Sequence, residues 1–339
     1  MALDFNNDPH RRLNILTGEW ILVSPHRTKR PWQGKVEKIV VEKRPSYDPH
    51  CYLCPGNMRA GGKVTEVYDS TFVFDNDFGA LLSESSNNVY DEGLFIARGE
   101  RGKCRVVCFS PDHSLTLPDM KVGDIKKVVD LWQHEYITLG SENYINHVQI
   151  FENKGSMMGC SNPHPHGQIW AQNSIPKEVT HKTKRQSEYW DKNHRSLLGD
   201  YLEQELEVET RIINQNEHFV SVVPFWAVWP YEAMIIPKEH FQHIGQLDHR
   251  RKNSFATILK DLTQRFDKVF NISFPYSSGI HQSPTDGKEH PGWHFHMSFY
   301  PPLLRSATVK KFMVGYEMFG EPQRDISAES AAEILKSIM

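Results

Sequence analysis

The chain contains the same succession of predicted elements twice, and this repetition is the feature that most limits the fold it can adopt. Residues 105–109 form a β-rich run, a loop with His113 follows, and apolar residues then recur at helical spacing. Later, the apolar run 234–236 leads into a loop with His240 and then into a second helical pattern over residues 255–269. Strand, histidine loop and helix therefore follow one another in the same order in two places.

A strand-like run and a pair of histidines complete each copy. The first pair is His164 and His166, and the second pair is His294 and His296. From the loop histidine to the last histidine the chain covers 53 residues in the first copy and 56 in the second. Similar elements at nearly equal spacing favour an internal duplication of two α+β half-domains, each of about 150 residues. The alternative is two unrelated α+β segments that match by chance.

The stretch between the two copies is strongly polar, with a few tyrosine, tryptophan and leucine residues as its apolar contacts. This composition is typical of linker helices and implies no chemistry of its own. A chain of 339 residues is also long for a single hydrophobic core. We therefore expect an N-terminal half at residues 1–178, a helical linker at 179–210 and a C-terminal half at 211–339.

Charge and composition exclude several classes of partner. The formal net charge is −3 and the basic residues are scattered, which argues against duplex nucleic acid as a partner. The N-terminal residues lack a signal sequence, and no run reaches the roughly 18 apolar residues that a membrane helix needs. We therefore expect a cytoplasmic protein that binds neither nucleic acid nor membranes. The five cysteines, an odd number, do not suggest a disulfide framework.

Two of these cysteines have a metal-ligand spacing. Cys51 and Cys54 are separated by two residues, which lets both sulfurs reach one tetrahedral ion from a tight turn. A structural zinc ion needs two more ligands, and the candidates are His113 and His164. We therefore expect one zinc ion per chain in a closed site that joins three distant stretches of the first half. The alternatives are a redox-active cysteine pair and two cysteines of an ordinary turn.

Residues 164–168, His-Pro-His-Gly-Gln, are the strongest candidate for catalysis. If this stretch is extended, His164, His166 and Gln168 point the same way, because side chains alternate across a strand. The first histidine can then bind the metal, the second is an oriented nucleophile, and the amide is a neutral donor to a developing oxyanion. The preceding residues are rich in Gly, Ser and Asn, which suits a loop whose N–H groups approach phosphate. The alternative is a polar turn without catalytic function.

Six longer motifs are NPHPHGQIW, FENKG, SPHRTKRPWQG, FDNDF, SPDHS and PPLLRSATVKKFMVGYEM. Together they resemble the galactose-1-phosphate uridylyltransferases, the transferase branch of the histidine-triad superfamily. The resemblance extends from about residue 9 to about residue 329. It implies two histidine-triad-like half-domains, each an antiparallel sheet with packed helices, and an active homodimer.

The resemblance also implies a reaction of galactose metabolism. The family exchanges UMP between UDP-glucose and galactose 1-phosphate, giving glucose 1-phosphate and UDP-galactose, by a ping-pong mechanism. The family's nucleophilic histidine falls on His166, which would carry UMP as a uridylyl-histidine, and Gln168 and Ser161 match other catalytic positions. The hydrolase branch has a third histidine where this chain has Gln168. Because an amide does not readily transfer protons, it favours transfer to a sugar phosphate over transfer to water.

The resemblance further implies two sets of substrate contacts. Arginine and lysine suit such a site because two anionic phosphates must be held. The set for uridine and its phosphates is Arg27, Asn76, Asp77, Phe78, Asn153, Gly159, Cys160, Ser161 and Gln168. The set that completes the sugar-phosphate site, in part from the partner subunit, is Arg30, Lys311, Phe312, Val314, Tyr316, Glu317 and Gln323. For Phe312 and Val314, ordinary packing is an equal alternative.

Many family members bind a second metal, iron or zinc, through one glutamate and three histidines. A lysine ammonium repels a cation, and a serine hydroxyl is a poor replacement for imidazole on a transition metal. We therefore expect the second site to be empty or weak, unless His294 or Glu178 supplies the lost ligands. The four matching positions in this chain are Lys182, His281, His296 and Ser298.

Two other functions remain open at this point. A related nucleotide-sugar phosphorylase or adenylyltransferase would use the same His166 chemistry. Against it, residues 310–318, KKFMVGYEM, resemble the hexose-reading segment of the uridylyltransferases. The second alternative is a zinc-organised binding module for nucleic-acid ends, and the near-neutral charge argues against it.

Overall fold

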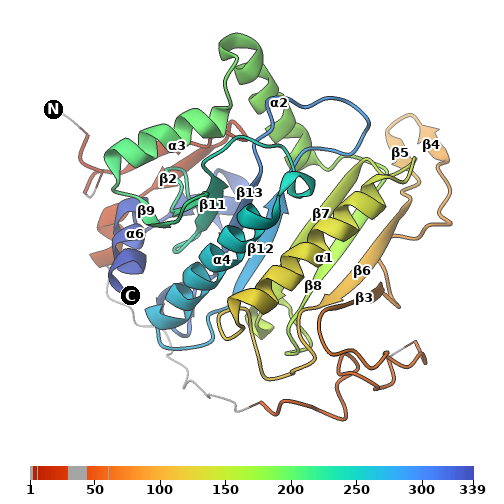
Figure 1. Cartoon of the computed structure of the whole chain (residues 1–339). Helices are drawn as coiled ribbons and strands as arrows, with labels where there is room; N and C mark the ends of the chain where they lie inside the picture. The colour runs from red at the N-terminus through yellow and green to blue at the C-terminus, as the bar shows by residue number, and fades with distance from the viewer. Residues whose placement is uncertain (1–2, 6, 30–43, 60) are drawn as a thin grey trace.

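The computed structural model describes residues 3–5, 7–29, 44–59 and 61–339, and its centre is one antiparallel sheet of nine strands (Figure 1). The strand order is β3-β6-β8-β7-β12-β13-β11-β10-β9. Strands such as β11 are buried along their whole length, which explains their continuous apolar sequence. In sheet order the strands are Phe72–Asp75, Gly102–Cys108, His166–Gln172, His147–Lys154, Tyr276–His281, His296–Tyr300, Ala233–Pro237, Phe219–Val222 and Ile212–Gln215.

The strand order shows the internal duplication directly. Counted outward from the centre, β7, β8, β6 and β3 of the first half correspond to β12, β13, β11 and β10 of the second. The halves meet where β7 pairs with β12, from Lys154 opposite Tyr276 to Phe151 opposite Gly279. The predicted α+β class, with antiparallel strands and packed helices, is confirmed. The two expected sheets are joined into one, which covers an edge that each would otherwise expose.

Two long helices, α1 (Val122–Gly140) and α4 (His249–Val269), lie side by side on one face of the sheet (Figure 1). The apolar residues that predicted these helices form their buried stripes and belong to one hydrophobic core that both halves share. A salt bridge of 2.7 Å between Lys252 Nζ and Asp130 Oδ1 joins the two helices. The halves therefore pack as one body rather than as two separate cores.

The polar segment between the halves forms two helices. Helix α2 (Lys177–Asn193) ends at His194, whose φ of 52° lies in the left-handed region. Helix α3 (Leu197–Val208) begins after Ser196, whose hydroxyl oxygen accepts a 3.2 Å hydrogen bond from the backbone N–H of Gly199. Helices α2 and α3 lead the chain from β8 in the first half to β9 at the edge of the sheet in the second half.

The two ends of the chain meet on the second half. Strands β1 and β2 form a hairpin, and β2 pairs in parallel with β16. The guanidinium of Arg12 donates two hydrogen bonds of 3.0 Å to the carboxylate of Glu329. The N-terminal hairpin therefore contacts the second half, although it precedes the first in the sequence. The bounds are His10–Leu13 for β1, Trp20–Val23 for β2, Gln323–Arg324 for β16 and Ala328–Ser337 for helix α6.

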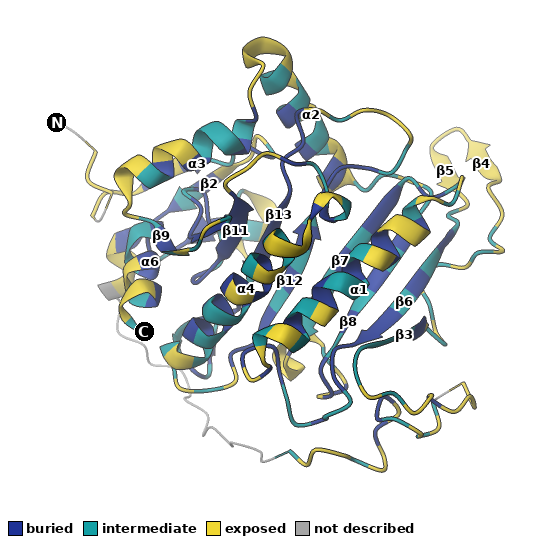
Figure 2. Ribbon diagram, viewed as in Figure 1, coloured by how far each residue is buried: buried dark blue, intermediate teal, exposed yellow. Residues whose placement is uncertain are grey.

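Figure 2 shows that the sheet and the inner faces of α1 and α4 are buried, whereas the β4–β5 hairpin is exposed. Within the described part of the chain, no helix is both long enough and apolar enough to cross a membrane. The remaining elements are β4 (Val89–Glu92), β5 (Phe95–Arg98), β14 (Leu303–Ser306), β15 (Val309–Lys310), α5 (Tyr316–Phe319) and the 3-10 helices η1 (Pro25–Lys29), η2 (Ser156–Met158) and η3 (Ile244–Gln246).

Candidate active site and metal centre

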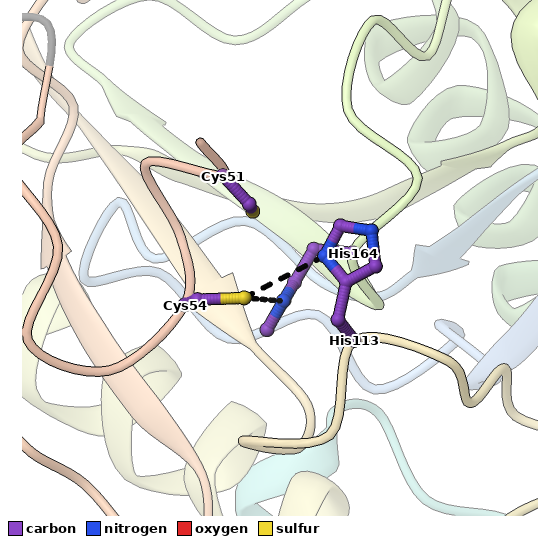
Figure 3. A group of neighbouring side chains, drawn as sticks. All are labelled: Cys51, Cys54, His113 and His164. Atoms are coloured by element: carbon purple, nitrogen blue, oxygen red, sulfur yellow. Dashed lines mark hydrogen bonds between the residues drawn. The ribbon is translucent and has the colours of Figure 1, made fainter. Parts of the chain in front are cut away.

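Four potential metal ligands from three separate stretches of the first half lie together (Figure 3). Cys51 and Cys54 share one turn, His113 follows β6, and His164 precedes β8. Their ligand atoms all lie within 4.8 Å of one another, and all four residues are buried. The Sγ atom of Cys54 lies 3.6 Å from Nδ1 of His113 and 3.6 Å from Nδ1 of His164. The structure thus brings together the four residues predicted to bind zinc.

This donor set fits a tetrahedral zinc ion. Two thiolates and two imidazoles form a common set for structural zinc, which keeps no open position for a substrate. Outside the set, the Nε2–H of His164 donates to the carbonyl oxygen of Ser110 at 2.9 Å, and the hydroxyl of Tyr68 lies 3.0 Å from the same nitrogen. These outer contacts turn Nδ1 of His164 toward Cys54, as is usual for histidines that bind a metal.

His166 is the first residue of β8 and lines a small pocket. Its Nδ1–H donates to the carbonyl oxygen of His164 at 2.7 Å. Because a carbonyl oxygen can only accept, this bond places the proton on Nδ1 and leaves the Nε2 lone pair available. Burial lowers the pKa of His166 and so favours the neutral ring. The pocket is lined by Asn153, Gly159, Cys160, Ser161, His166, Gly167 and Gln168.

Every residue of this pocket except Gly167 was predicted from the sequence to act in catalysis or to contact the uridine and its phosphates. Gly167 has a steric role instead. A Cβ atom there would lie 2.9 Å from the carbonyl oxygen of Phe151 and 3.0 Å from the ring of Phe109. At the rim, Gly159 adopts a φ of 78°, which favours glycine and ends the short η2 turn.

The extended segment begins later than the sequence suggested. Strand β8 starts at His166, so His164 lies before the strand and reaches the cysteine cluster, while His166 and Gln168 face the pocket. The Nε1–H of Trp170 donates to Oε1 of Gln168 at 3.0 Å. Sequence reasoning did not single out Trp170, because a tryptophan in a strand is ordinarily a packing residue.

Three members of the predicted sugar-phosphate set, Lys311, Glu317 and Gln323, form a separate polar group together with Arg27 of the uridine set. The Nζ of Lys311 contacts the carboxylate of Glu317 and lies 3.4 Å from Oε1 of Gln323. The Nε2 of Gln323 donates to Oδ1 of Asp325 at 2.8 Å, and Nε of Arg27 donates to the same oxygen at 3.0 Å. Four predicted residues therefore meet here, and none of them lines the pocket around His166. Sequence reasoning missed Asp325, which connects them.

The apolar members of the predicted sets are not core residues. Phe312, Val314 and Tyr316 are 60%, 56% and 53% exposed, and Phe78 is 75% exposed. Ordinary packing within this chain therefore does not account for Phe312 or Val314. Their exposure leaves them available to a substrate or to a second subunit.

Three further residues of the predicted substrate-binding sets are Asn76, Asp77 and Arg30. Asn76 and Asp77 follow β3 and do not line the pocket of His166, and Asp77 instead pairs with Arg59 at 3.3 Å. Arg30 lies outside the described residues.

The second half contains a closed counterpart of the histidine site. The Nδ1–H of His296 donates to the carbonyl oxygen of His294 at 2.9 Å, and Nε2–H of His294 donates to the carbonyl oxygen of Pro237 at 3.1 Å. In the first half, His166 and His164 make the equivalent bonds. Where His164 faces cysteines, however, Nδ1 of His294 meets the hydroxyl of Ser196 at 2.7 Å. Both ring nitrogens of His294 are therefore engaged by the protein.

The four positions at which the second metal site was expected to be empty or weak do not form a set of side chains that fits a metal ion. The Nζ of Lys182 is buried and lies 3.1 Å from Nδ1 of His281, whose ring stacks on that of His296 with centroids 4.7 Å apart. Burial lowers the pKa of Lys182 to about 8, so the group is still largely an ammonium at neutral pH. Glu178 is exposed, and His294 is already bonded. A buried lysine ammonium beside His281 would therefore repel a cation at this position.

Two family models match the chain: the N-terminal domain of galactose-1-phosphate uridyl transferase over residues 1–176, and its C-terminal domain over residues 182–339. Galactose-1-phosphate uridylyltransferases from Haemophilus influenzae and Saccharomyces cerevisiae are 49% and 47% identical to it. The alignments cover 97% and 99% of this chain, and 94% and 96% of those proteins.

Solved structures support the fold. A uridylyltransferase structure has a TM-score of 0.77 and 26% identity, covering 98% of each chain. An ADP-glucose phosphorylase from Arabidopsis thaliana with bound ADP-glucose has a TM-score of 0.76 and 25% identity, covering 98% of this chain and 100% of that one. This chain is about equally similar to the uridylyltransferase and to the phosphorylase, so the fold alone does not distinguish between these two activities. The family models and the sequence identities favour the uridylyltransferases. The chain belongs to the galactose-1-phosphate uridylyltransferase family.

Proposed function

We propose that this chain transfers UMP from UDP-glucose to galactose 1-phosphate, through a covalent intermediate on His166. The observation that carries the proposal is the orientation of that ring. Its Nδ1–H is bonded to the His164 carbonyl oxygen, and its Nε2 is the free nitrogen in a pocket that also contains Ser161 and Gln168. Family membership supplies the donor and the acceptor.

In the first half-reaction, Nε2 attacks the α-phosphorus of UDP-glucose. A P–N bond forms, the bond from the α-phosphorus to the bridging oxygen breaks, and glucose 1-phosphate leaves with that electron pair. The ring becomes positively charged, and the His164 carbonyl oxygen stabilises this charge through the 2.7 Å bond to Nδ1–H. In the second half-reaction a phosphate oxygen of galactose 1-phosphate attacks, the P–N bond breaks, and UDP-galactose leaves. Glucose 1-phosphate leaves as a stable anion and the His166 ring leaves as a neutral imidazole, so neither step needs a general acid.

Gln168 and Ser161 act on the phosphoryl oxygens in this proposal. Both line the pocket with His166, and an amide N–H or a hydroxyl can donate to charge that develops on these oxygens. Neither group readily carries protons between a water molecule and bulk solvent at neutral pH. The site therefore favours a sugar phosphate, which arrives as an anionic nucleophile, over water.

The sugar phosphate is bound, in this proposal, across a homodimer. The polar group that contains Arg27 and Lys311 does not line the pocket of His166 in its own chain. Beside it, Phe312, Val314 and Tyr316 are exposed, and on the first half the β4–β5 hairpin exposes Phe95 and other apolar residues. Exposed apolar surfaces of this kind are typical of subunit interfaces. We expect the partner's copy of the polar group to complete each site.

We expect a metal content that follows from two groups of residues, the cluster around His164 and the group around His281. The Cys51–Cys54–His113–His164 cluster would hold one zinc ion, which fixes the loop before His166 and takes no part in bond formation. The position of Lys182 and His281 would hold no metal. We place the enzyme in the cytoplasm, which suits buried, unpaired cysteines and a sugar-phosphate substrate.

The experiment is to incubate the protein with UDP-glucose that is radiolabelled in the α-phosphate. Acid-labile label should remain on the chain, and label in the glucose should not. ADP-glucose labelled in its α-phosphate is the parallel sample and should leave little label, whereas a phosphorylase acting on ADP-sugars would give the opposite pattern. Label from neither donor would contradict a covalent mechanism.

A further inference from the structure

The amide of Gln168 is held in one orientation by its neighbour on the strand. Trp170 is two residues further along β8, so it lies on the same face of the strand as Gln168. Its Nε1–H donates to Oε1 of Gln168 at 3.0 Å. An indole N–H can only donate, so it can bond to the amide oxygen but not to the NH2 group. The contact therefore distinguishes between two orientations of the amide that have almost the same shape.

We propose that Trp170 is a positioning residue, which keeps the NH2 group of Gln168 directed at the phosphoryl group being transferred. The inference rests on the proposed role of Gln168. With its oxygen bonded to the indole, the amide offers its N–H donors to the pocket. In the reversed orientation, the amide oxygen would face anionic phosphoryl oxygens, and the indole N–H would lose its acceptor. The hydrogen bond from Trp170 thus orients the N–H donors of Gln168 before the substrate binds.

Trp170 is itself held in place without being part of the pocket. Its ring meets the ring of Phe151 edge to face, with centroids 5.7 Å apart and planes at 78°. Phe151 lies directly opposite Gln168 in the pairing of β7 with β8. The indole therefore contacts both Gln168 and the residue across from it, while the pocket is lined by other residues. Since Trp170 does not line the pocket, the contact with Gln168 connects it to the proposed reaction.

The neighbouring amide of the pocket shows why the indole matters. The hydroxyl of Ser277 lies 2.6 Å from Oδ1 of Asn153. A hydroxyl can donate or accept, so it tolerates either orientation of the Asn153 amide. Of these two contacts, the hydrogen bond from Trp170 to Gln168 is therefore the one that selects a single amide orientation and leaves the NH2 group as a donor.

The test is a double-mutant cycle with Trp170→Phe and Gln168→Ala, measured by the exchange of glucose 1-phosphate into UDP-glucose. Phenylalanine keeps an aromatic ring against Phe151 and removes the N–H together with part of the indole's volume. Gln168→Ala should lower kcat about 100-fold, the scale for loss of one such donor. Trp170→Phe alone should lower kcat about 3- to 10-fold, with little change in KM, because the amide then samples both orientations. In the Gln168→Ala background, Trp170→Phe should change kcat less than about 2-fold.

The control is Trp293→Phe, which removes an indole N–H that donates to Thr183 at 2.8 Å in the second half. It should leave kcat unchanged even if the melting temperature falls. The inference is wrong if Trp170→Phe has the wild-type kcat, or if it slows the Gln168→Ala enzyme as much as the wild type. If Gln168→Ala alone keeps the wild-type kcat, the proposed role of Gln168 fails first, so the two failures are distinguishable.

Discussion

His166 and His296 occupy the same place in the two halves of this fold. Each is the first residue of its strand, and each donates from Nδ1–H to the carbonyl oxygen of the histidine two residues earlier, at 2.7 Å and 2.9 Å. Their surroundings differ. His166 lines a pocket, whereas His296 is fully buried beside Lys182 and its Nε2 has no hydrogen-bond partner within the described part of the chain. The same hydrogen-bond geometry thus occurs in both halves, but of the two histidines it is His166 that lines a pocket.

The matched pair His166→Asn and His296→Asn tests this difference. His166→Asn should abolish the exchange of glucose 1-phosphate into UDP-glucose in the absence of galactose 1-phosphate, because the nucleophile is lost. Its zinc content and fold should be unchanged. His296→Asn removes the same ring from the same backbone position and should retain exchange, at the expense of some stability. Exchange by His166→Asn at a rate near that of wild type would require a different nucleophile.

The metal cluster leads to a second prediction. Cys51→Ala should release the zinc ion and lower the free energy of unfolding by several kcal/mol, because metal binding is coupled to folding of the surrounding loops. Elemental analysis and thermal melts measure both effects. The control is Cys104→Ala, which removes a buried thiol outside the cluster and should keep one zinc ion per chain. Wild-type protein that is free of metal, yet folded and active, would rule out the site.

The third prediction concerns the second half. Wild-type protein purified without added metal should contain about one zinc ion per chain and negligible iron, because Lys182 takes the place of a cation beside His281. The paired substitution Lys182→Glu with Ser298→His restores two ligand-type side chains next to His281 and His296. It should bind a second zinc equivalent that survives desalting. Two tightly held metals in the wild type, or no second metal in the variant, would show that Lys182 and Ser298 do not decide occupancy.

The sequence predicted those parts of the site whose residue type and spacing are both restricted. Two cysteines with two residues between them, together with His113 and His164, are an unusual combination, and the structure brings all four together. The common direction of His166 and Gln168 was predicted for the same reason, because residues two apart on a strand share one face, and both line the pocket; their catalytic roles stay predictions.

Contacts between distant strands could not be predicted in this way. The pairing of β7 with β12 depends on which edges meet, and alternating apolar residues do not specify a partner strand. The bond from Trp170 to Gln168 was also missed, since the pattern that buries a tryptophan does not say where its N–H points. Nothing in the sequence distinguishes Asp325 from other acidic residues, yet its carboxylate accepts hydrogen bonds from both Arg27 and Gln323. Each of these features arises from packing between segments, which one-dimensional patterns do not contain.

The last prediction concerns acid stability and the contact between the two ends of the chain. Burial by itself raises the pKa of Glu329, but hydrogen bonds and positive charge from Arg12 and Arg211 outweigh this and lower the pKa to about 2. The carboxyl is therefore more acidic in the folded chain than in the unfolded chain, where its pKa is 4.5. The resulting stabilisation, about 3 kcal/mol, is fully present above pH 4.5 and is lost as the pH falls toward 2.

Glu329→Gln should consequently lower the free energy of unfolding at pH 7, and the difference from wild type should shrink steadily as the pH falls from 4.5 toward 2. Urea unfolding across this range measures the difference. The control is Glu321→Gln, which breaks a pair with Arg11, whose side chain is 53% exposed, and should change stability by less than about 1 kcal/mol at any pH. A Glu329→Gln difference that stays constant through acid would mean that packing of the glutamate, rather than its charge, holds the two ends of the chain together.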